Sequence, residues 1–161
     1  MPKCTPQATG NRGNPPQITS SAAAPNITVE IRPDNTRKAI NLGSTTDAAA
    51  NTLEISDAEL DRITAGTISI GLSNAGAITF SADITRATNT NVNLTTGAGN
   101  NISLGTFSLN AGSGGDVSLT TSGSGAITSG DNTGTDITGD DVTLNAGSGG
   151  IGSTTNFLRM E

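Results

Sequence analysis

The sequence predicts an all-β protein, built as a parallel β-solenoid with 24 to 25 residues in each coil. Three observations indicate this fold class. Short segments of alternating apolar and polar residues recur at nearly constant spacing from Gly66 onward, and a small or amide residue precedes every second segment at a fixed distance. The 161 residues include 21 glycines and only three aromatic side chains, Phe80, Phe107 and Phe157. Units so poor in large side chains must stack to bury an apolar face.

The chain before the repeats divides into two parts. Residues 1 to 25 are rich in Pro, Asn, Gln, Ser and Thr and have few large aliphatic residues, which predicts a disordered leader. Residues 26 to 65 hold three alternating segments, at 26–31, 38–42 and 52–55, which predict short strands. Ser56 and Glu59 fit a capping box and predict a short helix over 57–63, with a polar loop as the alternative. We expect this part to cap the first coil.

The repeats occupy residues 66 to 153 and place two strands in each coil. The first strands begin in steps of 24, 25 and 25 residues, and the second strands in steps of 24, 25 and 24. Stacked strands lie about 4.8 Å apart, so equivalent residues form columns. The first strands supply two columns. One consists of Ile68, Val92, Val117 and Val142, and the other of Ile70, Leu94, Leu119 and Leu144. The second strands supply Ile78, Ile102, Ile127 and Ile151. All three columns are expected in the interior.

A corner precedes each second strand by two residues. The residues there are Gly76, Asn100, Gly125 and Gly149, types that tolerate the left-handed backbone conformation of a turn. A third strand is less regular, and its candidates Ile84, Phe107 and Ile137 share no single offset. Residues 154 to 161 form a tail that is expected to be too short to cover the last coil, which leaves its strand edges open.

A β-sandwich or barrel is the strongest rival fold, because it also uses short strands with frequent turns. A sandwich or barrel gives no reason for two strands and a corner to recur at the same positions in every 24 to 25-residue repeat. A right-handed solenoid is expected from the general handedness of parallel β-connections.

Composition excludes several function classes. The chain has 8 basic and 14 acidic residues, which does not fit a nucleic-acid-binding protein. No segment resembles a membrane span or a secretory signal peptide. The single cysteine, Cys4, is predicted to be an incidental thiol. We expect no cofactor.

One column is a weak candidate for a calcium site. It consists of the residues that stand one position before the first apolar residue of each first strand: Asn91, Asp116 and Asp141, with Asp140 beside them. Carboxylate and amide oxygens suit calcium, but the favoured interpretation is that these are solvated turn residues. No catalytic residue is predicted. The chain has no His, Tyr or Trp, and Arg86 is the last basic residue before Arg159, so a β-helical carbohydrate-active site lacks its usual groups. Arg86 is expected in a solvated turn.

An ice-binding threonine array is a further alternative. The positions after the starts of the first strands are Ser69, Asn93, Ser118 and Thr143, which do not form a threonine ladder.

The passage "LEISDAELDRITAGTISIGLSNAGAITFSADIT", residues 53 to 85, resembles a segment of large bacterial exoproteins of the filamentous haemagglutinin type. The resemblance covers roughly residues 51 to 153, and "SDAELDRITAGT" with "NAGAITF" is its most specific part. It implies an extracellular β-helical stalk of a secreted or surface-displayed adhesin, exported by a partner pore in the outer membrane.

We therefore expect a non-enzymatic structural segment that acts in adhesion or surface display. Its partners would be neighbouring coils of a longer chain, or other copies that pair through open strand edges, and a cell-surface ligand that the sequence does not identify. A β-helical carbohydrate-binding or carbohydrate-active protein is the alternative.

Overall fold

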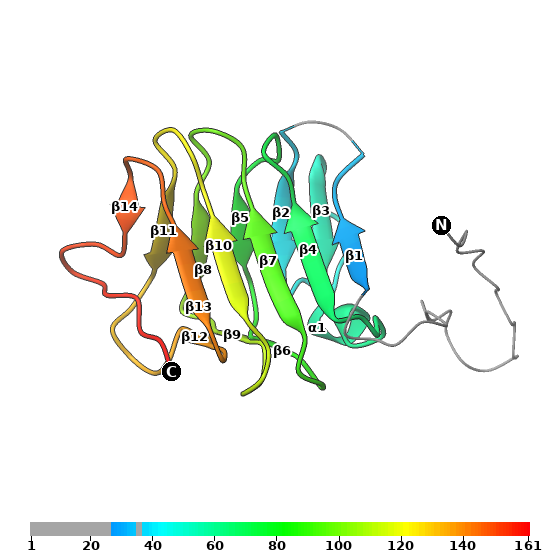
Figure 1. Cartoon of the computed structure of the whole chain (residues 1–161). Helices are drawn as coiled ribbons and strands as arrows, with labels where there is room; N and C mark the ends of the chain where they lie inside the picture. Colours follow the sequence, from blue (N-terminus) through cyan, green and yellow to red (C-terminus); the bar gives the residue numbers. More distant parts are fainter. Residues whose placement is uncertain (1–26, 35–36) are drawn as a thin grey trace, which may run out of the picture.

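The computed structural model describes residues 27–34 and 37–161 (Figure 1). This part of the chain is nearly all β, with three parallel sheets and one short helix. The predicted leader and Cys4 lie outside the described residues. Successive units pair strand by strand with their neighbours, and this arrangement is consistent with a β-solenoid.

The first sheet is formed by the first strand of every unit and lies at the front of Figure 1. Its strands, in spatial order, are β1 (Thr28–Ile31), β4 (Thr67–Gly71), β7 (Asn91–Thr95), β10 (Val117–Thr120) and β13 (Val142–Asn145). Val92 lies opposite both Ile68 and Val117, and Val117 lies opposite Val142. These are the neighbours that the repeat period predicts.

The second sheet lies behind the first and has one strand more. Its order is β14 (Gly150–Ile151), β11 (Ala126–Ser129), β8 (Ile102–Gly105), β5 (Ile78–Phe80), β2 (Ala39–Leu42) and β3 (Thr52–Ile55). Ile102 pairs with Ile78 and Ile127, and Ile127 pairs with Ile151. Strand β3 pairs with β2 and extends this sheet beyond the first one.

The third sheet is short and contains β12 (Ile137–Thr138), β9 (Leu109–Asn110) and β6 (Ile84–Thr85). Leu109 pairs with both Ile84 and Ile137. The prediction of Phe107 as the middle member was therefore wrong. Phe107 is only partly buried and packs against the edge of the core. The steps from Ile84 to Leu109 to Ile137 are 25 and 28 residues, and this inequality hid the true register.

The interior is a single cluster of apolar residues between the three sheets, aliphatic except for Phe80. Most column members are at most 3 % exposed, and Ile127 is fully buried. The last unit differs. Val142 and Leu144 are only partly buried, and Ile151 is 49 % exposed. The expectation that these three side chains lie in the interior is corrected, because no further strand of the described chain covers them on their outer side.

Helix α1 (Asp57–Leu60) follows β3 and is shorter than the predicted 57–63. Its capping box is present, with Ser56 Oγ accepting from the Glu59 backbone N–H and the Glu59 carboxylate accepting from the Ser56 N–H. Leu60 is buried and anchors the helix to the core. The helix ends early because the chain turns inward to bury Ile63 and Ala65 before β4. In the described part of the chain, no helix is long and apolar enough to cross a membrane.

Replacing Ser56 by Ala should lower the free energy of unfolding by about 1 kcal/mol at neutral pH, because the helix loses its N-cap. The N–H and hydroxyl of Ser56 hold the pKa of Glu59 below its usual value. The capping contribution of Glu59 is therefore complete above the unfolded-state pKa of about 4.3 and is lost as the pH falls through the lower folded-state pKa. Urea unfolding at pH 7 and pH 3 measures both effects. Glu59→Gln is the control, and an unchanged pH profile in this variant would contradict the assignment.

Candidate functional site

The predicted calcium column is a hydrogen-bonded ladder between successive units. The Asn91 side-chain amide donates to Asp116 Oδ2 at 3.0 Å, and the backbone N–H of Asp116 donates to Asn91 Oδ1 at 3.0 Å. The backbone N–H of Asp141 donates to Asp116 Oδ1 at 3.3 Å. The Oδ1 atoms of Asn91 and Asp116 thus accept from the backbone one unit further on, and Asp116 Oδ2 accepts from the side chain one unit earlier. The interpretation of these positions as solvated turn residues was incomplete, because Asn91 begins β7 and the column joins the units.

The same kind of hydrogen bond between successive units recurs at other positions of the repeat. Side-chain oxygens of Asp83, Asn101 and Asn132 accept backbone N–H groups that lie 25 residues further along the chain, at Ser108, Ala126 and Phe157. The sequence signal that marks these residues is an Asp or Asn directly before a strand, at Asp83 and Asn101, or in a loop, at Asn132, one period before a residue whose N–H needs an acceptor. Sequence reasoning missed this signal because the acceptors occupy different phases.

Among the described residues, no group of three or more His, Cys, Asp or Glu side chains is arranged to hold a metal ion. Asp140 is exposed, and its backbone N–H donates to Gly115 O. The side-chain oxygens of Asn91 and Asp116 already accept hydrogen bonds from backbone N–H groups of the next unit. These oxygens are therefore committed to joining the units.

Saturating calcium should leave the melting temperature of the chain unchanged. A specific site would raise stability by about 2.7 kcal/mol at a hundredfold excess of calcium over its dissociation constant. Differential scanning calorimetry with calcium and with magnesium measures the effect. Asp116→Asn keeps an acceptor for the Asp141 N–H, loses the one for the Asn91 amide and removes the carboxylate charge. A calcium-dependent shift that disappears in this variant would establish a site that we do not expect.

The predicted corner residues are needed for a different reason than the one expected. The left-handed glycines near the corners are Gly99, Gly123 and Gly150, which lie one or two residues from the predicted positions. Gly76, Gly125 and Gly149 are not among the residues with positive φ. A Cβ atom at the latter three would lie 2.4 to 2.7 Å from backbone atoms of the preceding unit. Close approach between stacked backbones therefore requires glycine there.

Asn100 takes the equivalent corner position in the remaining unit. Its side-chain amide donates to Ala75 O and to Gly97 O, both at 3.3 Å. Ala75 belongs to the preceding unit, so this amide joins two corners as well as stabilising its own turn.

The outer face of the first sheet carries hydroxyl and amide side chains. Ser69, Asn93, Ser118 and Thr143 are paired across neighbouring strands, and Asn93 Nδ2 donates to Ser69 Oγ at 3.4 Å. Chemically, this surface can exchange hydrogen bonds with polar ligands or with water.

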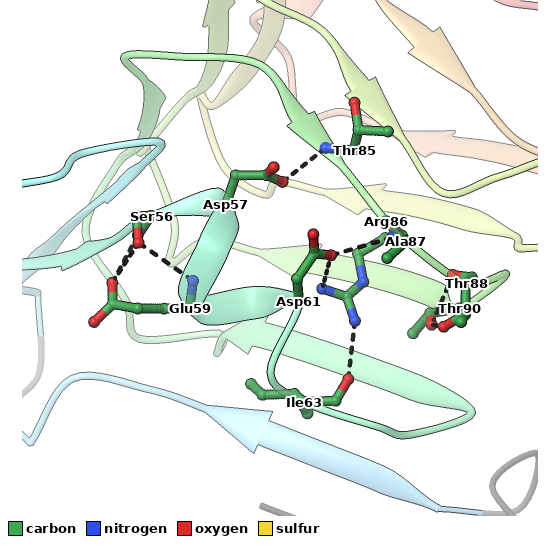
Figure 2. A network of polar contacts seen from close by, with 10 residues as sticks. All are labelled: Ser56, Asp57, Glu59, Asp61, Ile63, Thr85, Arg86, Ala87, Thr88 and Thr90. Atoms are coloured by element: carbon green, nitrogen blue, oxygen red, sulfur yellow. Dashed lines mark hydrogen bonds and ion pairs between the residues drawn. The ribbon is translucent and has the colours of Figure 1, made fainter. Parts of the chain in front are cut away.

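Helix α1 is joined to the third sheet by two carboxylates (Figure 2). Asp57 and Asp61 lie one helical turn apart, so their side chains are on the same face of the helix. Thr85 and Ala87 are two residues apart along an extended chain, so their N–H groups point to the same edge. Asp57 accepts from the Thr85 N–H at 2.9 Å and Asp61 from the Ala87 N–H at 3.1 Å. The helix thereby covers the outer edge of β6.

Arg86 lies between these two hydrogen bonds and is buried, which overturns its prediction as a solvated turn residue. Its guanidinium donates to Asp61 Oδ1 at 3.3 Å and to Ile63 O at 2.9 Å. Burial lowers the pKa of Arg86, and the charges of Asp61 and Asp57 oppose that change. Its side chain is 2 % exposed and that of Asp61 is 33 % exposed. The arrangement is an ion pair that closes the helix onto the sheet.

Comparisons of the chain with protein-family models, with curated proteins and with solved structures found no match.

Proposed function

We propose that the chain is a structural β-helical segment of a bacterial secreted or surface-displayed, adhesin-like exoprotein, and that it has no catalytic activity. In this proposal the three sheets wind as a right-handed solenoid, the hand favoured for parallel β-connections. The segment acts through its length, its stiffness and its repeated polar surface.

The observation that carries the proposal is the register of the first sheet. From β4 to β13 every pairing joins residues 24 or 25 positions apart, with one apolar column opposite the next. The side-chain ladder of Asn91 and Asp116 repeats this spacing outside the core. A unit that makes the same contacts on both of its sides can be added many times to lengthen a rod.

The resemblance of residues 51 to 153 to filamentous haemagglutinin-type exoproteins supports an extracellular role and export through a partner pore. The polar outer face of the first sheet supports contact with a hydrated surface. Neither a catalytic nor a cofactor-binding role is proposed for any residue.

The experiment is localisation in the bacterium that encodes the chain. An antibody against residues 66–153 should label intact cells or detect the protein in the culture medium, and proteinase K added to intact cells should remove the signal. A cytoplasmic protein that stays protected is the control. Deletion of the gene should reduce attachment to a surface. Detection only in the cytoplasmic fraction would contradict the proposal.

A further inference from the structure

The chain between β3 and β4 can detach without breaking the pairing of any sheet. Residues 56–66 link the two strands and contain α1. Strand β3 pairs with β2, and β4 pairs with β1 and β7, so neither strand needs the linker for its register. A helix of four residues is not stable by itself. The linker is therefore held by its contacts with the rest of the molecule, and Leu60 is the buried residue of the helix among them.

Two carboxylates of α1 take the place of a strand at the edge of the third sheet (Figure 2). A preceding strand would offer carbonyl oxygens to the outward N–H groups of β6. Here Asp57 accepts from the Thr85 N–H, and Asp61 accepts from the Ala87 N–H. Because no strand of the described chain lies on that side of β6, release of α1 would leave both N–H groups open. An edge in that state is a template for a further strand.

The charge of Asp61 compensates that of Arg86 in the interior. The Arg86 side chain is 2 % exposed, and its guanidinium donates to Asp61 Oδ1 and to Ile63 O. Its Nε has no hydrogen-bond partner among the described residues. A buried cation is costly unless a carboxylate faces it. When the charge of Asp61 is lost, the guanidinium is more stable in water than in the interior, and the linker that covers it has to move.

The other charged groups near this pair come from α1 and from the residues before β6. On α1 and directly after it they are Asp57, Glu59 and Arg62. Asp83 precedes β6, but its carboxylate accepts from the N–H and the hydroxyl of Ser108 in the next unit. Residues 87–158 contain no Lys or Arg, so neutralising a carboxylate there leaves no buried cation. A loss of negative charge therefore acts at the linker before it acts on the repeats.

We propose that residues 56–66 are a clasp that opens as one unit when the carboxylate of Asp61 is neutralised, while the three sheets stay paired. Acid neutralises it by protonation and thereby uncovers the edge of β6. The capping box acts in the same direction. The pKa of Glu59 is held below its usual value, so its contribution is complete at neutral pH and is lost as the pH falls through the folded-state pKa.

Hydrogen exchange of single amides tests the response to acid. Protection of the Thr85 and Ala87 N–H groups, corrected for the intrinsic exchange rate, should fall about tenfold or more between pH 7 and pH 3. Two amides are internal controls and should keep their protection. The Val92 N–H donates to a backbone carbonyl, and the Ser108 N–H donates to the carboxylate of Asp83. Equal loss of protection at all four amides, or no loss at the first two, would show that no clasp opens.

Trypsin tests the same opening at neutral pH. Arg62 lies in the clasp, and from residue 63 to 158 the only other cleavage site is Arg86. In Asp61→Asn, cleavage after Arg62 should be about tenfold faster or more. The rates are divided by those of unfolded peptides of residues 56–67, which corrects for the change in local sequence. Arg86 should stay uncut, because its backbone N–H donates to β9 at 2.9 Å and the third sheet remains paired.

Two further variants separate the clasp from a general effect of charge. Asp83→Asn removes a carboxylate on the other side of β6 and should leave the cleavage rate at Arg62 unchanged. Adding Arg86→Met to Asp61→Asn should restore the resistance of Arg62, because an apolar side chain leaves no uncompensated charge in the interior. An unchanged rate at Arg62 in Asp61→Asn, cleavage of both sites at one rate, or failure of Arg86→Met to restore resistance would overturn the inference. These readouts concern the purified chain, so their failure leaves the cellular test of the proposed function unaffected.

Discussion

Ile127→Asp should unfold the chain or lower its free energy of unfolding by roughly 4 kcal/mol or more, since the substitution buries a carboxylate without a partner and removes the packing of an aliphatic side chain. Ile127 is fully buried and lies in the second sheet between Ile102 and Ile151. It belongs to the apolar cluster of the interior, whose side chains cannot neutralise the new charge.

Circular dichroism during urea unfolding measures this change. Ser122→Asp, at an exposed corner five residues earlier, is the matched control and should cost less than about 0.5 kcal/mol. Equal tolerance of the two substitutions would contradict the register of the second sheet. The comparison also separates a local effect of burial from a general effect of added negative charge.

Asp61→Asn should be the second most damaging substitution, with a loss of about 2 to 3 kcal/mol. The asparagine can still accept from the Ala87 N–H, so the change removes the charge that compensates Arg86 and little else. Asp61 is one-third exposed, and water screens the pair in part. For this reason the loss should be smaller than for a fully buried ion pair.

The control for this prediction is Asp57→Asn, which keeps the hydrogen bond to Thr85 and has the weaker electrostatic effect on the guanidinium. It should cost under about 1 kcal/mol. Arg86→Met should also cost less than Asp61→Asn, because an apolar side chain leaves no uncompensated charge in the interior. If Asp57→Asn and Asp61→Asn unfold at the same urea concentration, the ion pair does not stabilise the helix as argued.

The sequence was sufficient to predict two of the three sheets. Equivalent residues such as Val92 and Val117 keep a constant period and alternate with polar neighbours, so periodicity alone identifies their partners. The third sheet has only two residues in each strand and an unequal spacing, so the local pattern favoured Phe107 over Leu109. Pairing along the whole unit decides between them, and a single sequence does not contain that information.

The candidate site was predicted by position but not by chemistry. The sequence correctly places Asn91 and Asp116 at equivalent positions of successive units. Position within the repeat does not reveal whether a side-chain oxygen faces solvent, a metal ion or an N–H group. Arg86 was misassigned because its partner Asp61 precedes the repeats and has no counterpart in later units. The reason for glycine at Gly125 was also hidden, since close approach and positive φ favour the same residue type.

The unequal step in the third sheet has a consequence for how such a chain can evolve. Between Ser129 and Ile137 the chain makes an excursion that is closed locally, with the Thr133 N–H donating to Asp131 Oδ1 at 3.0 Å. At its tip, Gly134 has no atom within contact distance of the Cβ position. The β8–β11 pairing shifts its register at Ser129, where the excursion begins, and the next pairings, β10 with β13 and β11 with β14, are again regular. Insertions and deletions are therefore tolerated on this side, and new recognition loops can be acquired there while the stack itself is inherited unchanged.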